Sequence, residues 1–139
     1  MISIDLSVRQ QALLERMRNA VLVTVGLNGA PHVAPVWYFW DGEKMRISAP
    51  ATTRKVADVR ADKRVAVCVD DQVSGEYLTI YGSAVVVDGE PVSELTEPLL
   101  LRYLPPDEAA ARWARINADN SRVIIVVTPA RTAGREHVA

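Results

Sequence analysis

Apolar and polar residues alternate along most of the chain, which is the spacing of β-strands rather than helices. Val21, Val23 and Val25 share one face of a first strand, and the Asn28-Gly29 pair after them favours a two-residue hairpin turn. Further strands are expected where the same period, or a run of branched aliphatic residues, recurs: 31–41, 43–49, 65–69, 76–88 and 121–128. The pattern therefore predicts six strands that are joined mostly by hairpins.

Helical spacing is confined to a few stretches. Residues 7–18 begin with Ser7 and Gln10, which have the spacing of a capping box. The others are 54–62, after an expected N-cap at Thr53, and 91–117, with interruptions at Pro98 and at Pro105-Pro106. Because helices do not alternate with strands, the pattern favours a small antiparallel barrel with helices at its rim.

Two features are expected to distort or end the last strands. Gly82 lies inside the fifth strand, where a glycine is typical of a bend or a β-bulge. The residues from Pro129 onward are mostly polar, so this tail is expected to be loose.

The composition is that of one globular domain, residues 1–139, with 49% hydrophobic and 24% charged residues. A net charge of -1 gives no overall attraction to nucleic acid or to an anionic membrane, so neither is expected as a partner. The single cysteine, Cys68, excludes an internal disulfide framework and a multi-cysteine zinc site. Neither a spanning apolar run nor the order of a signal peptide is present, so a cytoplasmic protein is expected, with no metal site.

Several familiar catalytic motifs are absent, among them GxGxxG, the P-loop, HExxH and GxSxG. The two histidines are His32 and His137, and the second falls in the polar tail. A histidine-based triad would therefore depend on His32 alone. No side chain is assigned as catalytic on this basis.

The segment from Ser48 to Lys55 combines features that bind phosphate. Hydroxyls at Ser48, Thr52 and Thr53 lie close to the free N–H groups of a helix start, and Arg54 and Lys55 add two cations. The positive charges oppose the helix dipole at this end, a conflict that a bound anion would remove. The alternative is a solvated basic helix start without a ligand.

The strand at 33–40 is apolar on both faces. Val33, Trp37 and Phe39 alternate with the residues of the other face, Ala34, Val36, Tyr38 and Trp40. One face would join the core, and the other has to be covered by a second subunit, a helix or a flat ring ligand. Proline at position 35 donates no ladder hydrogen bond, so an edge or break is expected nearby.

These features occur in an order that resembles a known family. The runs VLVTVGLNGAPHVAPVWYFWDGEKMRIS, TTRKVADVRADKRVAVCVDD and GEYLTIYGSAVVVD are similar to pyridoxamine 5′-phosphate oxidase-like split barrels, and within them to the small flavin and deazaflavin oxidoreductases. The resemblance covers roughly residues 12–128. It implies a mainly β fold, a six-stranded antiparallel split barrel of Greek-key type, which forms a homodimer with cofactor sites between the subunits.

The resemblance also implies roles for particular residues. Contacts to the cofactor ring and ribityl chain fall on Val33, Pro35, Val36 and Trp37. Contacts to its phosphate fall on Ser48, Thr53, Arg54 and Lys55. Tyr77 would reach the site from the other subunit. The C-terminal segment TPARTAGREHVA does not resemble the substrate segment of true pyridoxamine phosphate oxidases, so that substrate is not expected.

The implied cofactor is coenzyme F-420, with FMN as the alternative. Both carry a phosphorylated ribityl chain, and F-420 adds an oligoglutamate tail that would suit the basic cluster Arg54, Lys55, Arg60, Lys63 and Arg64. The implied function is hydride transfer to an electron-poor small organic substrate. The rival functions are an FMN-dependent oxidase or reductase, a haem- or tetrapyrrole-binding barrel without turnover, and a purely structural barrel. The candidate proton donors are water, Tyr38 and Tyr77.

Overall fold

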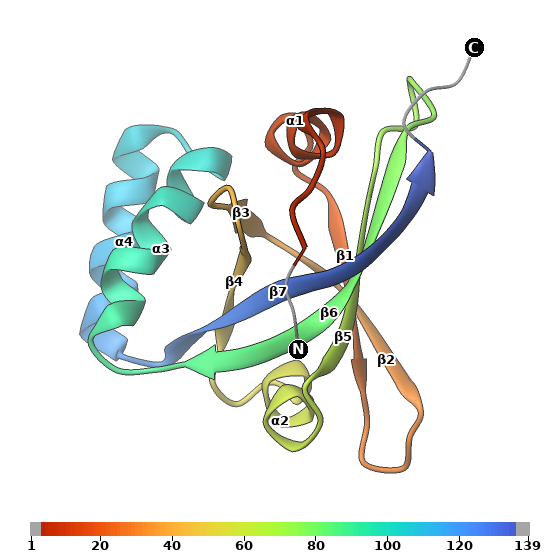
Figure 1. Ribbon diagram of the computed structural model, residues 1–139. Helices are drawn as coiled ribbons and strands as arrows, with labels where there is room; N and C mark the ends of the chain where they lie inside the picture. Colours follow the sequence, from red (N-terminus) through yellow and green to blue (C-terminus); the bar gives the residue numbers. More distant parts are fainter. Residues whose placement is uncertain (1–3, 136–139) are drawn as a thin grey trace.

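The computed structural model describes residues 4–135 and shows one curled sheet with four helices around it (Figure 1). The elements are α1 (Val8–Arg16), β1 (Ala20–Val25), β2 (Pro31–Val36), β3 (Tyr38–Trp40), β4 (Met45–Pro50), α2 (Arg54–Ala61), β5 (Arg64–Asp70), β6 (Tyr77–Val87), α3 (Pro91–Tyr103), α4 (Pro106–Asp119) and β7 (Arg122–Arg135). Within the described residues, no helix is long and apolar enough to cross a membrane.

All neighbouring strands are antiparallel, in the order β2-β1-β5-β6-β7-β4-β3. Strands β2 and β3 are separated along the chain by Trp37 alone, yet they lie at opposite edges of the sheet. A single residue spans that distance only if the sheet curls until its two edges meet, which gives the half-barrel. The predicted strand 31–41 is therefore two strands, and the described sheet has seven strands instead of six.

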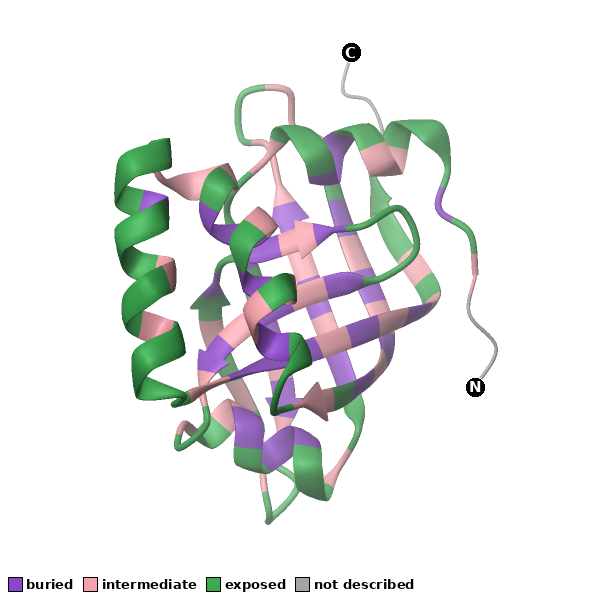
Figure 2. Cartoon of the chain, turned by 90° about the vertical axis from the view of Figure 1, so that its left-hand side faces the viewer, coloured by how far each residue is buried: buried purple, intermediate pink, exposed green. Residues whose placement is uncertain are grey.

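The core lies inside the curl. Buried and partly exposed residues alternate along the strands (Figure 2), as in β4, where Met45, Ile47 and Ala49 are buried. Val36, Tyr38 and Trp40 are also buried, so theirs is the face of the 33–40 segment that joins the core. The period-two pattern thus gave the correct inward face, because a one-residue shift would move every apolar side chain to the solvent side.

The first helix begins as predicted. Ser7 accepts a hydrogen bond from the Gln10 backbone N–H at 3.1 Å, and the Gln10 side chain accepts one from the Ser7 N–H at 2.9 Å. This completes the capping box and satisfies N–H groups that have no partner within the helix. At its other end, the Tyr38 hydroxyl contacts the Leu14 and Met17 carbonyls, which fixes the helix to β3.

The expected interruption at Pro98 is wrong, because α3 continues through it. A proline removes the bond to the carbonyl four residues earlier, and here that carbonyl belongs to the exposed residue Glu94, where water is available. The pair Pro105-Pro106 does separate α3 from α4. Helix α4 packs on α3 and is largely exposed (Figure 2), and the half-buried Trp113 donates its indole N–H to the Ser93 carbonyl at 2.9 Å.

Strand β7 is longer than predicted. The expectation of a loose tail from Pro129 is wrong as far as Arg135, because β7 pairs with β6 from Ile124 to Arg135. The predicted bulge at Gly82 is confirmed, with the register shifting between Tyr81 and Gly82. The polar end of β7 belongs to the sheet because it pairs with β6 beyond the bulge. The sequence of this segment alone does not indicate that it forms a strand. His137 lies outside the described residues.

Candidate cofactor-binding site

A cavity of about 310 Å³ opens where the sheet changes from β2 to β3, beneath α3 and α4. Five of the nine predicted site residues line it: Pro35, Val36, Trp37, Ser48 and Lys55. The remaining lining residues are Pro50, Leu99, Leu100, Arg112, Ile116 and Arg122. The cavity therefore combines an apolar wall with a cationic wall.

Ser48 reaches the cavity because it occupies an outward position of β4, between the buried Ile47 and Ala49. Antiparallel pairing brings the start of β7 beside this end of β4, with Arg122 opposite Pro50. The Arg122 Nε–H donates to the Ser48 hydroxyl oxygen at 2.9 Å. This bond holds the half-buried guanidinium of Arg122 on the cavity wall.

Three cations line the cavity: Lys55 from α2, Arg112 from α4 and Arg122 from β7. Burial, together with the charge of Arg122, lowers the pKa of the Lys55 ammonium. Burial, together with the charge of Arg112, lowers the pKa of the Arg122 guanidinium. Among residues 4–135, no carboxylate lies within 4.0 Å of any of the three cations. The cationic wall is thus short of negative charge, as in sites that bind an anion.

The apolar wall centres on Trp37. Its indole stacks on the Tyr103 ring with centroids 4.4 Å apart, and the Arg112 guanidinium lies 6.0 Å from its centroid. The Tyr103 hydroxyl accepts from the Tyr38 backbone N–H at 2.9 Å and donates to the Arg18 carbonyl at 2.9 Å. Because Tyr103 is fixed by both bonds, it holds the half-exposed Trp37 ring at the cavity edge.

Two predicted phosphate residues point elsewhere in the single chain. The Thr53 hydroxyl donates to the Pro50 carbonyl at 2.8 Å and makes no capping bond to α2. Arg54 lines a separate cavity with His32 and Asp58. Successive helix residues differ by about 100° in direction, so Arg54 and Lys55 at the start of α2 face different surroundings.

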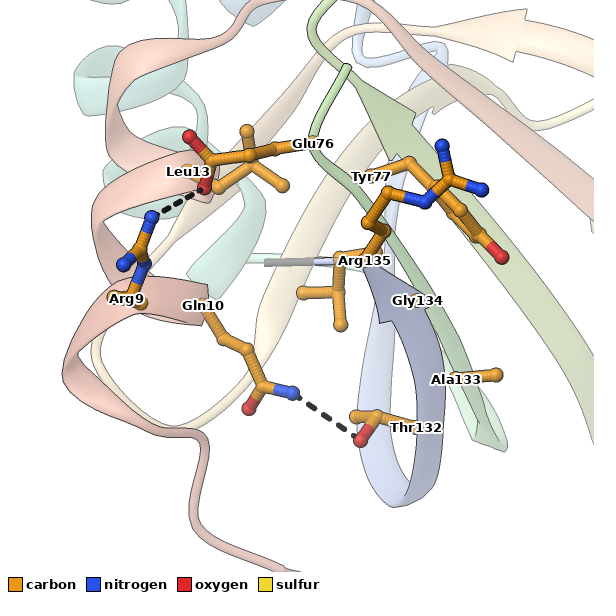
Figure 3. Close-up of a pocket in the computed structure, with 10 residues that line it drawn as sticks. Arg9, Gln10, Leu13, Glu76, Tyr77, Thr132, Ala133, Gly134 and Arg135 are labelled. Atoms are coloured by element: carbon orange, nitrogen blue, oxygen red, sulfur yellow. Dashed lines mark hydrogen bonds and ion pairs between the residues drawn. The ribbon is translucent and has the colours of Figure 1, made fainter. Parts of the chain in front are cut away.

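The remaining two predicted residues lie on other surfaces. Val33 is 58% exposed on the outer face of β2. Tyr77 begins β6 and lines a cavity of about 340 Å³ with Arg9, Gln10 and Arg135 (Figure 3). The described chain does not bring either residue to the cationic cavity. Their predicted contacts would require a second subunit.

Tyr38 is wrong as a candidate proton donor. Its side chain is fully buried, and its hydroxyl lies 2.6 Å from the Leu14 carbonyl and 2.7 Å from the Met17 carbonyl. Burial raises the pKa of this hydroxyl well above its ordinary range. Tyr38 is therefore a structural residue.

The sequence reasoning missed Arg112 and Arg122. Arg122 precedes a run of buried aliphatic residues, and only the pairing of β4 with β7 brings it to Ser48, which is 74 residues away. Arg112 is one of several exposed charged residues of α4, such as Glu108, Arg115 and Asp119. No local pattern distinguishes either arginine from the other exposed ones.

Comparisons with known proteins agree with this architecture. The sequence profile described as pyridoxamine 5′-phosphate oxidase matches residues 7–135. An F420 reductase is 31% identical, with a TM-score of 0.70, and the match covers 88% of this chain and 94% of that one. No curated protein matches the chain.

Two further solved structures share the fold at lower identity. The conserved hypothetical protein Rv2991 of Mycobacterium tuberculosis is 24% identical, with a TM-score of 0.79, over 100% of this chain and 94% of that one. General Stress Protein 26 of Bacillus anthracis is 18% identical, with a TM-score of 0.71, over 94% and 93%. Since the family profile spans nearly the whole chain and an F420 reductase is 31% identical, the chain belongs to the pyridoxamine 5′-phosphate oxidase family, which includes oxidoreductases.

Proposed function

We propose that the protein is an oxidoreductase that binds a phosphorylated flavin-type cofactor in the cationic cavity, with F-420 ranked ahead of FMN. The observation that carries the proposal is the convergence of Lys55, Arg112 and Arg122 without a nearby carboxylate in the described chain. A cofactor phosphate supplies the missing negative charge. The transferred hydride travels on the cofactor when it is bound, and the substrate is an electron-poor small organic molecule.

The residues present fit a phosphate. Arg122 and Arg112 offer planar guanidinium groups, Lys55 offers a point charge, and Ser48 adds a hydroxyl. Burial is the main cause that lowers the pKa of Lys55 and Arg122, and the charges of Arg122 and Arg112, respectively, add to it. An anion between the cations would relieve this repulsion. The cationic wall therefore sets where the phosphate is held.

The apolar wall suits the remainder of the cofactor. Pro35 has no N–H group, and Val36 and Trp37 add apolar surface beside it. A ribityl chain and the edge of a ring would lie along this wall, with water excluded by Leu99 and Ile116. The role of the chain is to bind the cofactor, orient its ring and keep water away from it. No lining residue is assigned as an acid or base.

We further propose that two copies of the chain form the complete site. Pairing across the outer sheet face aligns two rows of half-exposed or exposed residues: Pro35, Val21, Cys68, Thr79 and Ala133, and beside them Val33, Val23, Ala66, Tyr81 and Arg131. Most of these side chains are small or apolar, as in the interface of a homodimer. A second copy on this face would cover Val33 and bring its own Tyr77 near the cofactor ring.

The ranking of F-420 rests on similarity and charge. The F420 reductase at 31% identity supports it. In the basic cluster, Arg60 pairs with Asp88 and Arg64 pairs with Asp62, while Arg54 and Lys63 have no carboxylate within 4.0 Å among the described residues. The positive charge available to an oligoglutamate tail is therefore smaller than the number of basic residues in the cluster suggests. FMN presents the same phosphate and ribityl chain, so it remains the alternative.

The test is an equilibrium fluorescence titration of apoprotein with F-420 and with FMN. We expect saturable binding of at least one cofactor and a loss of affinity of tenfold or more in Lys55→Met and in Arg122→Met. Arg115→Met is the matched control, because Arg115 lies on the exposed side of α4 outside the cavity. Binding of neither cofactor would overturn the proposal, and a Soret band on adding haem instead would favour the tetrapyrrole rival.

A further inference from the structure

A second cavity, of about 550 Å³, lies between the β1–β2 hairpin and α2. Its walls are mainly small or apolar residues of the hairpin and of α2: Gly26, Leu27, Asn28, Ala30, Pro31 and Ala57. Three charged or titratable side chains complete the lining, namely His32, Arg54 and Asp58. This cavity shares no lining residue with the cationic cavity, although Arg54 also belongs to the basic cluster considered for the F-420 tail.

Asp58 is buried, with only 6% of its side chain exposed. Its Oδ2 accepts a hydrogen bond from the Thr24 hydroxyl at 2.8 Å and lies 3.3 Å from Nδ1 of His32. A buried carboxylate is costly unless positive or donor groups compensate it. Thr24 and His32, from the paired strands β1 and β2, are the groups that do so.

This contact determines how His32 faces the cavity. Nδ1 is buried and its geometry with Asp58 falls short of a hydrogen bond, while 31% of the His32 side chain is exposed. A proton on Nδ1 would face the carboxylate oxygen favourably, whereas a lone pair there would repel it. Nε2 is then the nitrogen left for a ligand, as a donor when the ring is doubly protonated.

Arg54 supplies the second group. It is exposed at the start of α2, and no carboxylate lies within 4.0 Å of its guanidinium in the part of the chain that is described. The ionisable groups facing His32 are Asp58 and Arg54, both from α2, while β1 contributes the neutral Thr24 and the hairpin contributes Asn28. With the imidazole protonated, the three charges sum to one positive charge.

We propose that this cavity binds one organic carboxylate, held between the Arg54 guanidinium and the Nε2–H of protonated His32. A single carboxylate neutralises the site, and the apolar walls accept an aliphatic body behind it. Either a free organic acid or the oligoglutamate tail of F-420 would present this group. Only the second source rests on the proposed function.

The test follows the ring C–H resonance of His32 by NMR, with isovalerate as the probe and isovaleramide as its neutral match. The titrations at pH 5.5, 6.5 and 7.5 contain no cofactor. A lack of isovalerate binding would therefore contradict only this proposal and not the proposed cofactor site. We expect a saturable shift with isovalerate and none with the amide.

Two variants make the result specific. Arg54→Met and His32→Gln should each lower isovalerate affinity at pH 5.5 by tenfold or more, and the amide N–H correlation spectrum checks that each variant folds. Lys44→Met, an exposed lysine outside the cavity, should change nothing. Equal binding of acid and amide, or an unchanged affinity in Arg54→Met, would overturn the proposal.

Tri-γ-glutamate distinguishes the two sources of the carboxylate. Binding at least tenfold tighter than isovalerate, with competition between the two, would identify the cofactor tail as the ligand. Tighter binding of isovalerate would identify a free acid. If neither isovalerate nor tri-γ-glutamate binds at ligand concentrations of tens of millimolar, the proposed site is rejected.

Discussion

The Nε–H of Arg122 donates to the hydroxyl of Ser48 at 2.9 Å, across the paired strands β7 and β4. Both side chains line the cationic cavity, together with Lys55. The bond fixes one guanidinium edge to the sheet and leaves the terminal nitrogens of Arg122 for a ligand. It therefore links the strand pairing of the fold to the geometry of the proposed phosphate site.

The first prediction distinguishes two contributions of Arg122 to cofactor binding, the position of its guanidinium and its positive charge. Arg122→Lys keeps a cation but loses the planar donor that Ser48 holds, so cofactor affinity should fall less than in Arg122→Met. Ser48→Ala should weaken binding by a smaller factor, and its effect should largely disappear in the Arg122→Met background, because the two residues act together. Fluorescence titration of the four variants measures this coupling. Independent, additive effects would show that the bond does not position the guanidinium.

Lys55 should lower the stability of the apoprotein and strengthen cofactor binding. Burial and Arg122 lower the pKa of Lys55, so the unfolded chain binds its proton more tightly than the native chain does. The free energy of unfolding therefore rises as the pH increases from the native pKa of Lys55 to the ordinary lysine pKa. Above that pH the amine is neutral in both states. Lys55→Met removes this repulsion, and we expect it to raise the apoprotein Tm by about 1–3 °C at pH 7.

The same substitution should abolish most of the Tm increase that cofactor gives to the wild type, because binding stabilises only the native state. Differential scanning fluorimetry with and without F-420 or FMN measures both effects. A lower apoprotein Tm in Lys55→Met, at an unchanged ligand response, would show that Lys55 is a structural residue.

The sequence pattern predicted those parts of the site that are local. Ser48 and Lys55 lie on the two sides of a strand-to-helix connection, and the alternation in β4 indicates which way Ser48 points. The cationic partners come from β7 and α4, and long-range pairing decides their place. The jump from one sheet edge to the other at Trp37 is also non-local, so the single apolar run looked like one strand.

Tyr38→Phe should destabilise the fold by about 0.5–1.5 kcal/mol, because the carbonyls of Leu14 and Met17 lose a buried hydrogen bond and keep only the Arg102 guanidinium as a donor. Urea denaturation at pH 7 measures this loss. Burial also raises the pKa of Tyr38, so above the ordinary tyrosine range the unfolded chain loses a proton that the native chain keeps. Wild-type stability should therefore fall with pH above that range, and the fall should be smaller in Tyr38→Phe.

Gly82→Ala tests the bulge between β6 and β7. A Cβ at this position would lie 2.1 Å from the Thr128 carbonyl oxygen, so the backbone of one strand has to move. We expect a loss of about 1–3 kcal/mol in urea denaturation, the usual range for overpacking. Gly89→Ala, where a Cβ meets nothing within 4 Å but φ is +80°, is the comparison that isolates backbone strain from contact. A stability equal to wild type in Gly82→Ala would mean that the two strands separate there without cost.

The outer sheet face provides the last prediction. Val33 and Val23 lie opposite each other on the half-exposed row that we propose as the subunit interface. Val33→Asp would place a charge in that interface without touching the core, so it should shift the sedimentation coefficient from dimer to monomer and weaken cofactor binding at the same time. Val73→Asp, at a 99% exposed position in the β5–β6 loop, should change neither property. A monomeric wild type, or a Val33→Asp variant that stays dimeric, would contradict the use of this face, and a monomer that binds cofactor at full affinity would show that one chain forms the complete site.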